Sequence, residues 1–269
     1  MIDLTLQWCS ILLLVASAAL CCDPSSSMTP TQQPARGALW SADHETGDLS
    51  QWYSPALAAT GAHGGGIYNS GAGVAAPSRD FAHSGSWSAR LTINTPDKPT
   101  SGTRLFRWRE SHAHPDLYYD VWLYFPSNYV APSFWNVMQW KSLRAGHADS
   151  DPFFFVNIRS RADRSMEFNL FNWQTKRNYY QQLATLPVGR WFRVTAHYVC
   201  SGSPDGSVTV WQDGVLLFDV RNVQTRYTDG DCGWSVNNYS DQLVPASATI
   251  YVDDAMISTI PPVFKITTN

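Results

Sequence analysis

Charged residues are scarce in this 269-residue sequence, and neither sign dominates: 19 Lys and Arg stand against 22 Asp and Glu, for a formal net charge of −3. A protein with so little net charge has no global positive field to attract nucleic acid, which excludes nucleic acid as a partner. An anionic ligand would need a local cluster of basic side chains. Because 44% of the residues are hydrophobic and only 15% are charged, the composition is that of a globular protein.

Long hydrophobic runs are also few. The clearest one covers residues 11–20 and is too short to cross a membrane as a helix, so no membrane span is expected. A stretch rich in Ser, Pro, Thr and Gln follows. This order predicts a signal peptide over residues 1–22, a flexible tether over 23–37 and one folded domain over 38–269. We therefore expect a secreted or cell-surface protein. A lipid anchor on one of the two cysteines that end the signal peptide is the alternative to free secretion.

Cysteine is nearly absent from the expected mature domain, where only Cys200 and Cys232 remain. In an oxidising compartment a single pair most simply forms one disulfide. Cys200 ends a predicted strand and Cys232 lies in the sequence TDGDCG, read here as a loop. The bond would then tie a loop to a sheet. Two unpaired buried thiols are the alternative.

Amphipathic helical patterns are missing from residue 38 onward, which excludes folds that alternate strands and helices. In their place are short runs of alternating apolar and polar residues, separated by turn residues, as expected for antiparallel strands. The three clearest runs are LYYDVWLYFP (117–126), FFFVNIRSR (153–161) and RWFRVTAHYVC (190–200). We predict an all-β fold, a two-sheet antiparallel β-sandwich of roughly a dozen or more strands.

Glycine supports two local predictions. Asp213 and Gly214 lie between two alternating runs and suit a two-residue type I′ turn, in which both central residues have positive φ, so a tight hairpin is expected. Three consecutive glycines begin at Gly64, and further glycines follow. This composition predicts a flexible loop over residues 61–78, long enough to act as a lid over a groove.

Aromatic residues are abundant, with 12 each of Trp, Tyr and Phe. Side chains alternate across a strand, and several predicted strands place aromatic and polar residues on the same face. Sugar rings present apolar C–H faces between hydroxyl groups, so a sugar site combines aromatic platforms with hydrogen-bonding and charged groups. The candidate glycan-binding residues are Trp122, Tyr124, Trp135, Gln139, Lys141, Asn157 and Arg159. The alternative is that these aromatics fill the interior of the sandwich.

Segments from the beginning, middle and end of the domain carry a family resemblance. They are LWSADHETGDLSQW (39–52), SGTRLFRWRES (101–111), YYDVWLYFPSNYVAPSFWNVMQWKS (118–142), WSVNNYSDQL (234–243) and IYVDDAMIS (250–258). In these segments the chain resembles the concanavalin A-like jelly-roll polysaccharide lyases, the group that includes the heparin lyase I-like, glucuronan lyase and alginate lyase families. The resemblance implies a jelly-roll fold and β-elimination at a uronic acid of an acidic polysaccharide.

Such an elimination needs a group that neutralises the uronate carboxylate, a base that removes the C5 proton and an acid that protonates the leaving oxygen. The resemblance implies that Gln139 neutralises the carboxylate, together with Arg107 or Arg109, whose guanidinium forks match its two oxygens. Lys141 stands where the family has a histidine. Because lysine in water has a pKa of about 10.4, Lys141 is expected to hold an acidic sugar rather than to remove a proton.

The remaining two roles fall to tyrosine and histidine. The resemblance places Tyr239 at the tyrosine that the family uses as the acid, or as both acid and base. A structural tyrosine at a strand end is the alternative. His197 lies on the polar face of its predicted strand and is the first candidate for the base. His112 and His114 are the second choice, and solvated loop histidines are the alternative for that pair.

Acidic residues near both ends of the domain suggest a structural calcium site. Glu45 and Asp48 precede the central strands and Asp253 and Asp254 follow them. Calcium prefers such oxygen ligands, and many carbohydrate-active jelly rolls bind it between their first and last strands. The chemistry itself is expected to need no cofactor. Solvated turn carboxylates are the alternative.

Three functions are compatible with these observations. The first is an exported polysaccharide lyase that acts as a monomer on an acidic polysaccharide or another glycan. The second is a non-catalytic carbohydrate-binding module, and the third is a surface adhesion domain of the same fold. A glycoside hydrolase ranks lower because it needs two carboxylates beside the bond, and Glu167 is isolated in its run.

Overall fold

The computed structural model describes residues 37–57, 63–95 and 100–263. The predicted signal peptide, and the predicted tether apart from its last residue, lie outside the described residues. Within the described part of the chain, none of the helices has the length and apolarity needed to cross a membrane.

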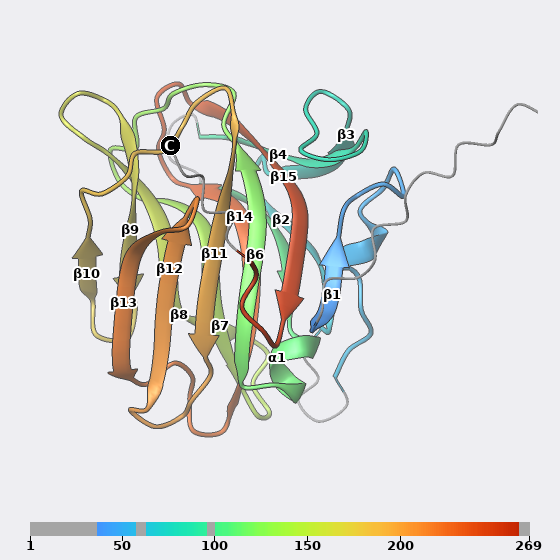
Figure 1. The fold of residues 1–269 in the computed structure, drawn as a ribbon, viewed down its shortest axis with the longest axis vertical. Helices are drawn as coiled ribbons and strands as arrows, with labels where there is room; N and C mark the ends of the chain where they lie inside the picture. Colours follow the sequence, from blue (N-terminus) through green and yellow to red (C-terminus); the bar gives the residue numbers. More distant parts are fainter. Residues whose placement is uncertain (1–36, 58–62, 96–99, 264–269) are drawn as a thin grey trace, which may run out of the picture. The chain divides into compact units, whose positions relative to one another are not determined.

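Two antiparallel sheets, of eight and seven strands, form the domain (Figure 1). The first contains, in spatial order, β13 (Val215–Val223), β12 (Gly206–Gln212), β11 (Trp191–Val199), β6 (Asp116–Tyr124), β15 (Ser247–Ser258), β4 (Ser88–Asn94) and β3 (Val74–Ser78), with β1 (Ala38–Ala42) beside β15. The second contains β10 (Arg177–Tyr180), β9 (Met166–Asn172), β8 (Ser150–Ser160), β7 (Trp135–Arg144), β14 (Gly230–Ser240), β5 (Ser101–Arg107) and β2 (Gly65–Ser70). The described helices are short: α1 (Arg109–Ala113) and the 3₁₀ turn η1 (Ser50–Trp52). The predicted two-sheet sandwich is confirmed.

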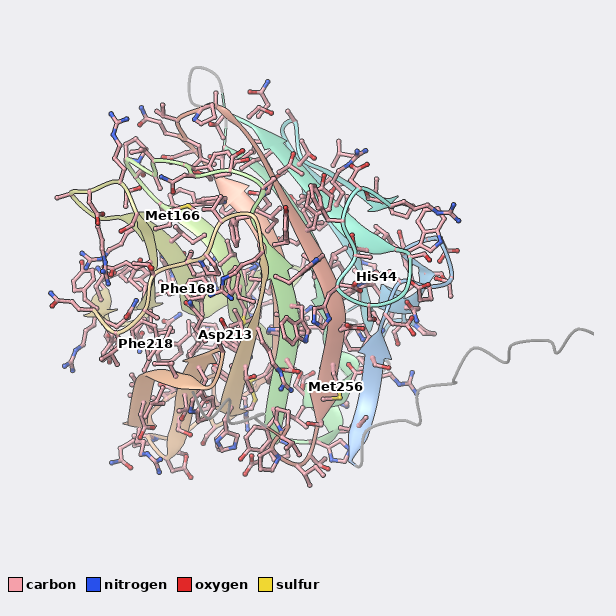
Figure 2. All side chains as sticks on the ribbon, turned by 45° about the horizontal axis from the view of Figure 1, so that its top comes forward. His44, Met166, Phe168, Asp213, Phe218 and Met256 are labelled. Carbon is pink, nitrogen blue, oxygen red and sulfur yellow. A yellow bond between two sulfur atoms is a disulfide. The ribbon has the colours of Figure 1, made fainter. Side chains whose placement is uncertain are left out.

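The apolar faces of the strands pack between the sheets. Each of the three runs singled out in the sequence is a strand, and its apolar positions are buried as alternation predicts, for example Val121 in β6, Val156 in β8 and Val194 in β11. Phe168 of β9 and Phe218 of β13 belong to the same buried cluster, and both are labelled in Figure 2. The opposite faces of both sheets are therefore the places where polar side chains gather.

The two glycine-based predictions have different outcomes. Asp213 and Gly214 have φ values of 48° and 82° and join β12 to β13, which confirms the tight hairpin. The predicted flexible loop over residues 61–78 is wrong, because β2 and β3 occupy most of it. A Cβ atom on Gly64 would lie 2.1 Å from the carbonyl oxygen of Pro55. Here the glycines permit close approach of two backbone segments rather than a mobile loop.

The predicted disulfide between Cys200 and Cys232 is present. Its position differs from the prediction, because Cys232 lies inside β14 rather than in a loop. Cys200 directly follows β11. The bond therefore joins a strand of the seven-stranded sheet to the end of a strand of the eight-stranded sheet.

Removing this cross-link should destabilise the domain. For a separation of 32 residues, the chain-entropy relation gives a loss of about 4 kcal/mol in the free energy of unfolding for the C200S/C232S double variant. Denaturant titration of the variant against the oxidised wild type measures this difference. An unchanged transition midpoint would show that the bond does not constrain the unfolded chain.

Candidate functional site

A pocket of about 530 Å³ opens on the outer face of the seven-stranded sheet, the face directed away from the other sheet. Strands β2, β5, β7 and β14 supply most of its walls. Its lining residues are His63, Tyr68, Arg104, Phe106, Trp108, Gln139, Lys141, Leu143, His147, Ala148, Asp149, Ser150, Gly233, Trp234 and Ser235. Two predicted site residues, Gln139 and Lys141, are thus neighbours here.

A β-bulge in β7 decides which of its side chains reach this face. The register shifts between Asn136 and Met138, which reverses the alternation along the strand. Trp135 consequently points into the core, where it is fully buried and its indole N–H donates to Asn238 at 2.9 Å. The prediction of Trp135 as a sugar platform is wrong. Asn136 takes the outer face in its place and donates to Asn157 at 3.1 Å.

Lys141 is partly buried in the pocket. Burial, and next the nearby charge of Arg104, lower the pKa of Lys141 from 10.5 to about 8, against the opposing effect of Asp151 and Asp149. With the ordinary pKa of lysine in water, Lys141 was expected only to hold the acidic sugar. With the lowered pKa, a substantial neutral fraction exists near pH 8, so proton abstraction becomes chemically accessible.

Arg104 is the guanidinium that the strand pattern did not assign to the site. It lies on β5 between two aromatic rings, with its guanidinium carbon 4.4 Å from the ring centre of Tyr239 and 5.2 Å from that of Tyr68. Burial lowers the pKa of Arg104, while the two phenols counteract this shift. Through Arg104, the predicted catalytic Tyr239 contacts the pocket that contains Gln139 and Lys141.

The two arginines proposed for carboxylate binding lie elsewhere. Arg107 is buried, pairs with Glu110 and donates to the carbonyl oxygens of Trp52 and Tyr53 at 3.0 and 3.3 Å. Its hydrogen-bonding capacity serves the fold, so its assignment to substrate is wrong. Arg109 is exposed on α1 and does not line the pocket. Arg104 and Arg107 lie on opposite faces of β5, and alternation alone does not show which of the two faces is open.

Three further predicted residues lie on the eight-stranded sheet, across the sandwich from the pocket. His197 of β11 pairs with Asp116 at 2.6 Å. In β6, Trp122 stacks on His83 with ring centres 3.6 Å apart, and Tyr124 is buried beneath a loop. These three residues therefore do not lie with Gln139 and Lys141, and their roles in a sugar site stay predictions. Strand alternation distinguishes two faces of one strand, but not the sheet to which the strand belongs.

Asn157 and Arg159 of β8 lie on the same outer face as the pocket without lining it. Asn157 accepts the hydrogen bond from Asn136, and Arg159 forms an ion pair with Glu167. These two residues flank the pocket on the side of β9. The isolated carboxylate of Glu167 is fully buried and also pairs with Arg161, so it is a structural ion-pair partner.

Several buried polar atoms around the pocket have no hydrogen-bond partner among the described residues. Four of them are Arg104 Nε, Gln139 Nε2, Ser235 Oγ and Asn237 Oδ1. Gln139 is only 2% exposed and Ser235 only 4%. Buried polar groups in folded proteins are nearly always paired, and leaving one unpaired costs about 1–3 kcal/mol. The N–H donors of Arg104 and Gln139 are suited to a carboxylate ligand.

Other residues of the pocket were missed for identifiable reasons. Tyr68 lies in β2, which the sequence analysis read as a loop. Gly233 is needed because a Cβ atom there would lie 2.3 Å from the ring of Trp108, which covers β14 beside Lys141. The sequence DCGW contains that glycine, but nothing local connects it to a tryptophan so far away in the chain.

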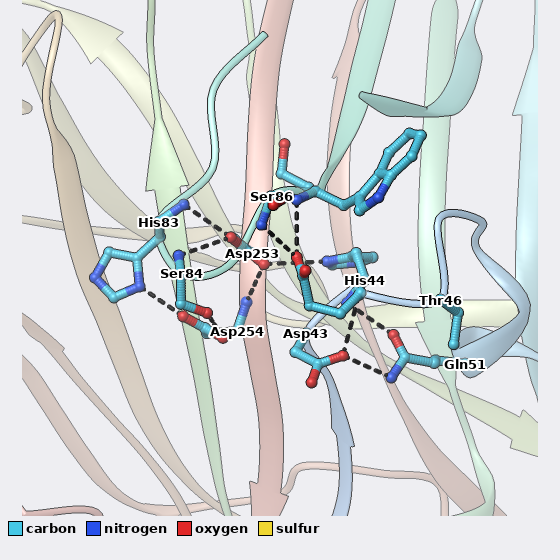
Figure 3. A network of polar contacts seen from close by, with 12 residues as sticks. Asp43, His44, Thr46, Gln51, His83, Ser84, Ser86, Asp253 and Asp254 are labelled. Carbon is cyan, nitrogen blue, oxygen red and sulfur yellow. Dashed lines mark hydrogen bonds and ion pairs between the residues drawn. The ribbon is translucent and has the colours of Figure 1, made fainter. Parts of the chain in front are cut away.

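Asp253 and Asp254, two of the residues proposed for calcium, belong to a network of polar contacts (Figure 3). Asp253 pairs with the ring of His44 and accepts backbone N–H groups of His83, Ser84 and Asp254. Glu45 accepts two backbone N–H groups, Asp254 accepts the hydroxyl of Ser84, and Asp48 accepts from the turn that begins η1.

In the described part of the chain, no group of three or more His, Cys, Asp or Glu side chains is arranged to hold a metal ion. Calcium binds oxygen ligands, but the carboxylate oxygens of Asp253 already accept hydrogen bonds from backbone N–H groups. The network gives no support to a calcium site, and calcium binding stays a prediction.

One family model matches this chain in sequence, and several solved structures are similar to it in fold. The model of a family described as polysaccharide lyase matches residues 44–254. No curated protein matches significantly in sequence.

Solved structures share the fold at low identity. Endo-β-1,4-glucuronan lyase from the fungus Trichoderma reesei is similar with a TM-score of 0.61 and 14% identity, over 83% of this chain and 96% of that one. The marine alginate lyase from Aplysia kurodai has a TM-score of 0.52 and 12% identity, over 84% and 99%. A cellulose-induced protein has a TM-score of 0.53 and 13% identity, over 82% and 97%.

Proposed function

The chain belongs to the polysaccharide lyase family, and from this premise we propose that it cleaves a uronic-acid-containing polysaccharide by β-elimination in the pocket of the seven-stranded sheet. The observation that carries the proposal is the pair of unpartnered buried donors, Arg104 Nε and Gln139 Nε2, in the pocket that also contains Lys141. A neutral sugar offers no carboxylate for them. The disulfide and the predicted signal peptide support an extracellular location.

The first requirement of the reaction is neutralisation of the uronate carboxylate, because this makes the C5 proton more acidic. Arg104 supplies a cation and an N–H donor, and Gln139 supplies a second donor. Both are held by packing: Arg104 between two aromatic rings and Gln139 within the central strand β7. They take the role that the sequence analysis divided between Gln139 and the arginines 107 and 109.

The second requirement is movement of two protons. Neutral Lys141 accepts the C5 proton; the C–H electron pair forms the C4–C5 double bond, and the C4–O4 bond breaks. Tyr239 donates its hydroxyl proton to the leaving O4, and its phenolate lies beside the Arg104 cation. Proton exchange with water returns both groups to their starting forms. Lys141 thus replaces His197 as the base, since His197 lies on the other sheet.

A direct assay tests this function. The secreted domain is incubated with polyglucuronate, alginate, heparin and pectate, and the ultraviolet absorbance of the new conjugated double bond is followed. We expect absorbance to rise with at least one of these polymers. Binding without any rise in absorbance would instead assign the pocket to a non-catalytic carbohydrate-binding module.

The pH dependence of the reaction follows from the lowered pKa of Lys141. The neutral amine is the active form, so kcat/KM should rise with pH through an apparent pKa of about 8. A lysine of ordinary pKa would place this rise about two units higher. Initial rates at subsaturating polymer across this range measure the profile. A kcat/KM that is flat from about pH 7 to 9 would remove Lys141 from the role of base.

Replacement of His197 tests whether the reaction takes place on the seven-stranded sheet and not on the eight-stranded sheet, where His197 lies. The H197A variant should retain turnover within roughly twofold of wild type, because surface substitutions away from a site have small effects. The rate of double-bond formation provides the measurement. A loss of a hundredfold or more would place the reaction on the eight-stranded sheet and overturn the assignment of the pocket.

A further inference from the structure

A cluster of three aromatic side chains extends the outer face of the seven-stranded sheet beyond the pocket. Phe155 of β8 stacks on Phe171 of β9 with ring centres 6.2 Å apart. Trp173, directly after β9, meets both rings edge-on at 5.9 and 6.1 Å. Neither Phe155 nor Phe171 lies in the core between the sheets, and none of the three takes part in the proposed reaction.

The cluster is open to solvent. Trp173 is 40% exposed, and both phenylalanines are partly exposed. Single apolar side chains on a surface need no explanation, but a contiguous aromatic patch beside a pocket is typical of a binding surface. Aromatic faces of this kind match the apolar C–H face of a sugar ring.

A positive charge lies on the same surface. Lys176 Nζ is 3.2 Å from the ring centre of Trp173, at the end of the turn that joins β9 to β10. Lys176 has a φ of 57°, a left-handed conformation that glycine and asparagine adopt more easily. Lys176 thus lies over one face of the Trp173 indole. An aromatic platform with a cation beside it is complementary to a sugar that carries a carboxylate.

The cluster is continuous with the pocket. Phe155 is the cross-strand neighbour of Gln139, and Phe171 is in turn the neighbour of Phe155. Because adjacent strands lie about 4.8 Å apart, the platform begins about 5 Å from Gln139 and extends to about 10 Å. This span is on the order of one or two linked sugar rings.

We propose that Phe155, Phe171, Trp173 and Lys176 form an additional subsite that binds a further uronate unit of the polysaccharide chain held in the pocket. The inference rests on the proposed function, since it takes its ligand to be the same acidic chain. The subsite lengthens the stretch of polymer that the protein holds without contributing to bond cleavage.

Variants of Trp173 test the subsite by chain length. In W173A, KM for the long form of the polymer that is cleaved should rise roughly threefold to tenfold, as expected for the loss of one aromatic contact. The value of kcat, and KM for the shortest oligosaccharide that is cleaved, should stay unchanged. W87A is the matched control, because Trp87 also carries a cation over its ring, from Arg79 at 4.3 Å, and does not line the pocket. The K176N variant removes the charge but tolerates the turn, and should weaken binding at low salt more than at high salt.

Either of two results for W173A would contradict the proposed subsite. The KM values for long and short substrates could both stay within twofold of wild type, or both could rise by the same factor. If the wild type cleaves none of the polymers, the proposed function fails separately. Calorimetric titration of W173A and W87A with polyglucuronate and alginate then tests whether the subsite binds the polymer. Weaker binding by W173A than by W87A supports it, and equal or undetectable binding by both contradicts it.

Discussion

Replacing Lys141 with methionine is expected to abolish turnover while making the protein more stable at neutral pH. Loss of a general base typically lowers kcat by about 10² to 10⁴. K141R is the informative companion, because arginine keeps the positive charge but does not give up a proton at any working pH. If Lys141 is the base, both variants are inactive. If it only holds the substrate carboxylate, K141R retains substantial turnover, and the proposed mechanism is contradicted.

The stability effect follows from the lowered pKa of Lys141. The folded state has a pKa of about 8 and the unfolded state one near 10.5, so the charged amine is less favourable in the folded protein. Below pH about 8 both states are protonated, and the burial penalty, on the order of 3 kcal/mol, applies in full. As pH rises from about 8 toward 10.5, the folded state loses its proton first and wild-type stability increases.

K141M removes that penalty, so its free energy of unfolding at pH 7 should exceed that of wild type, and the gain should shrink as the pH approaches 10. Urea titrations at both pH values measure the difference. K141R should show no gain. A methionine variant that is less stable than wild type at neutral pH would show that the lysine is not penalised by its surroundings.

Replacing Arg104 with methionine is expected to produce the second large loss of activity. Removing one preorganised donor that stabilises developing charge typically lowers kcat by about 10² to 10³. Because the carboxylate is also held in the ground state, KM should rise as well. Full kinetic curves for R104M, with circular dichroism to verify folding, separate the two parameters.

R221M is the matched control for R104M, since Arg221 is 70% exposed on β13 of the opposite sheet and pairs only with Asp219 among the described residues. It should behave as wild type. Equal turnover in R104M and R221M would exclude Arg104 from carboxylate recognition. Gln139 would then be the one remaining residue proposed for that role.

The fold could be predicted from the sequence because its signals are local. Apolar alternation identified strands such as β6, β8 and β11, and Asp213-Gly214 identified a hairpin. The disulfide followed from there being one pair of cysteines in the expected mature domain. None of these inferences depends on how distant segments meet.

The site could be predicted only in part, because its formation depends on contacts between distant segments. Gln139 and Lys141 were found because both project from one strand. His197 and Trp122 have the same alternating pattern, but their strands belong to the other sheet. Trp135 was misplaced because a bulge is not visible in the alternation that it interrupts. The lowered pKa of Lys141 depends on burial and on Arg104 from a strand far away in sequence.

The most direct test of the proposed site is a crystal structure of K141M soaked with an oligosaccharide of the polymer that binds. We expect one uronate carboxylate within hydrogen-bonding distance of Arg104 Nε and Gln139 Nε2, with the Tyr239 hydroxyl directed at the glycosidic oxygen. A sugar bound on the eight-stranded sheet, or a carboxylate turned away from Arg104 and Gln139, would contradict the account.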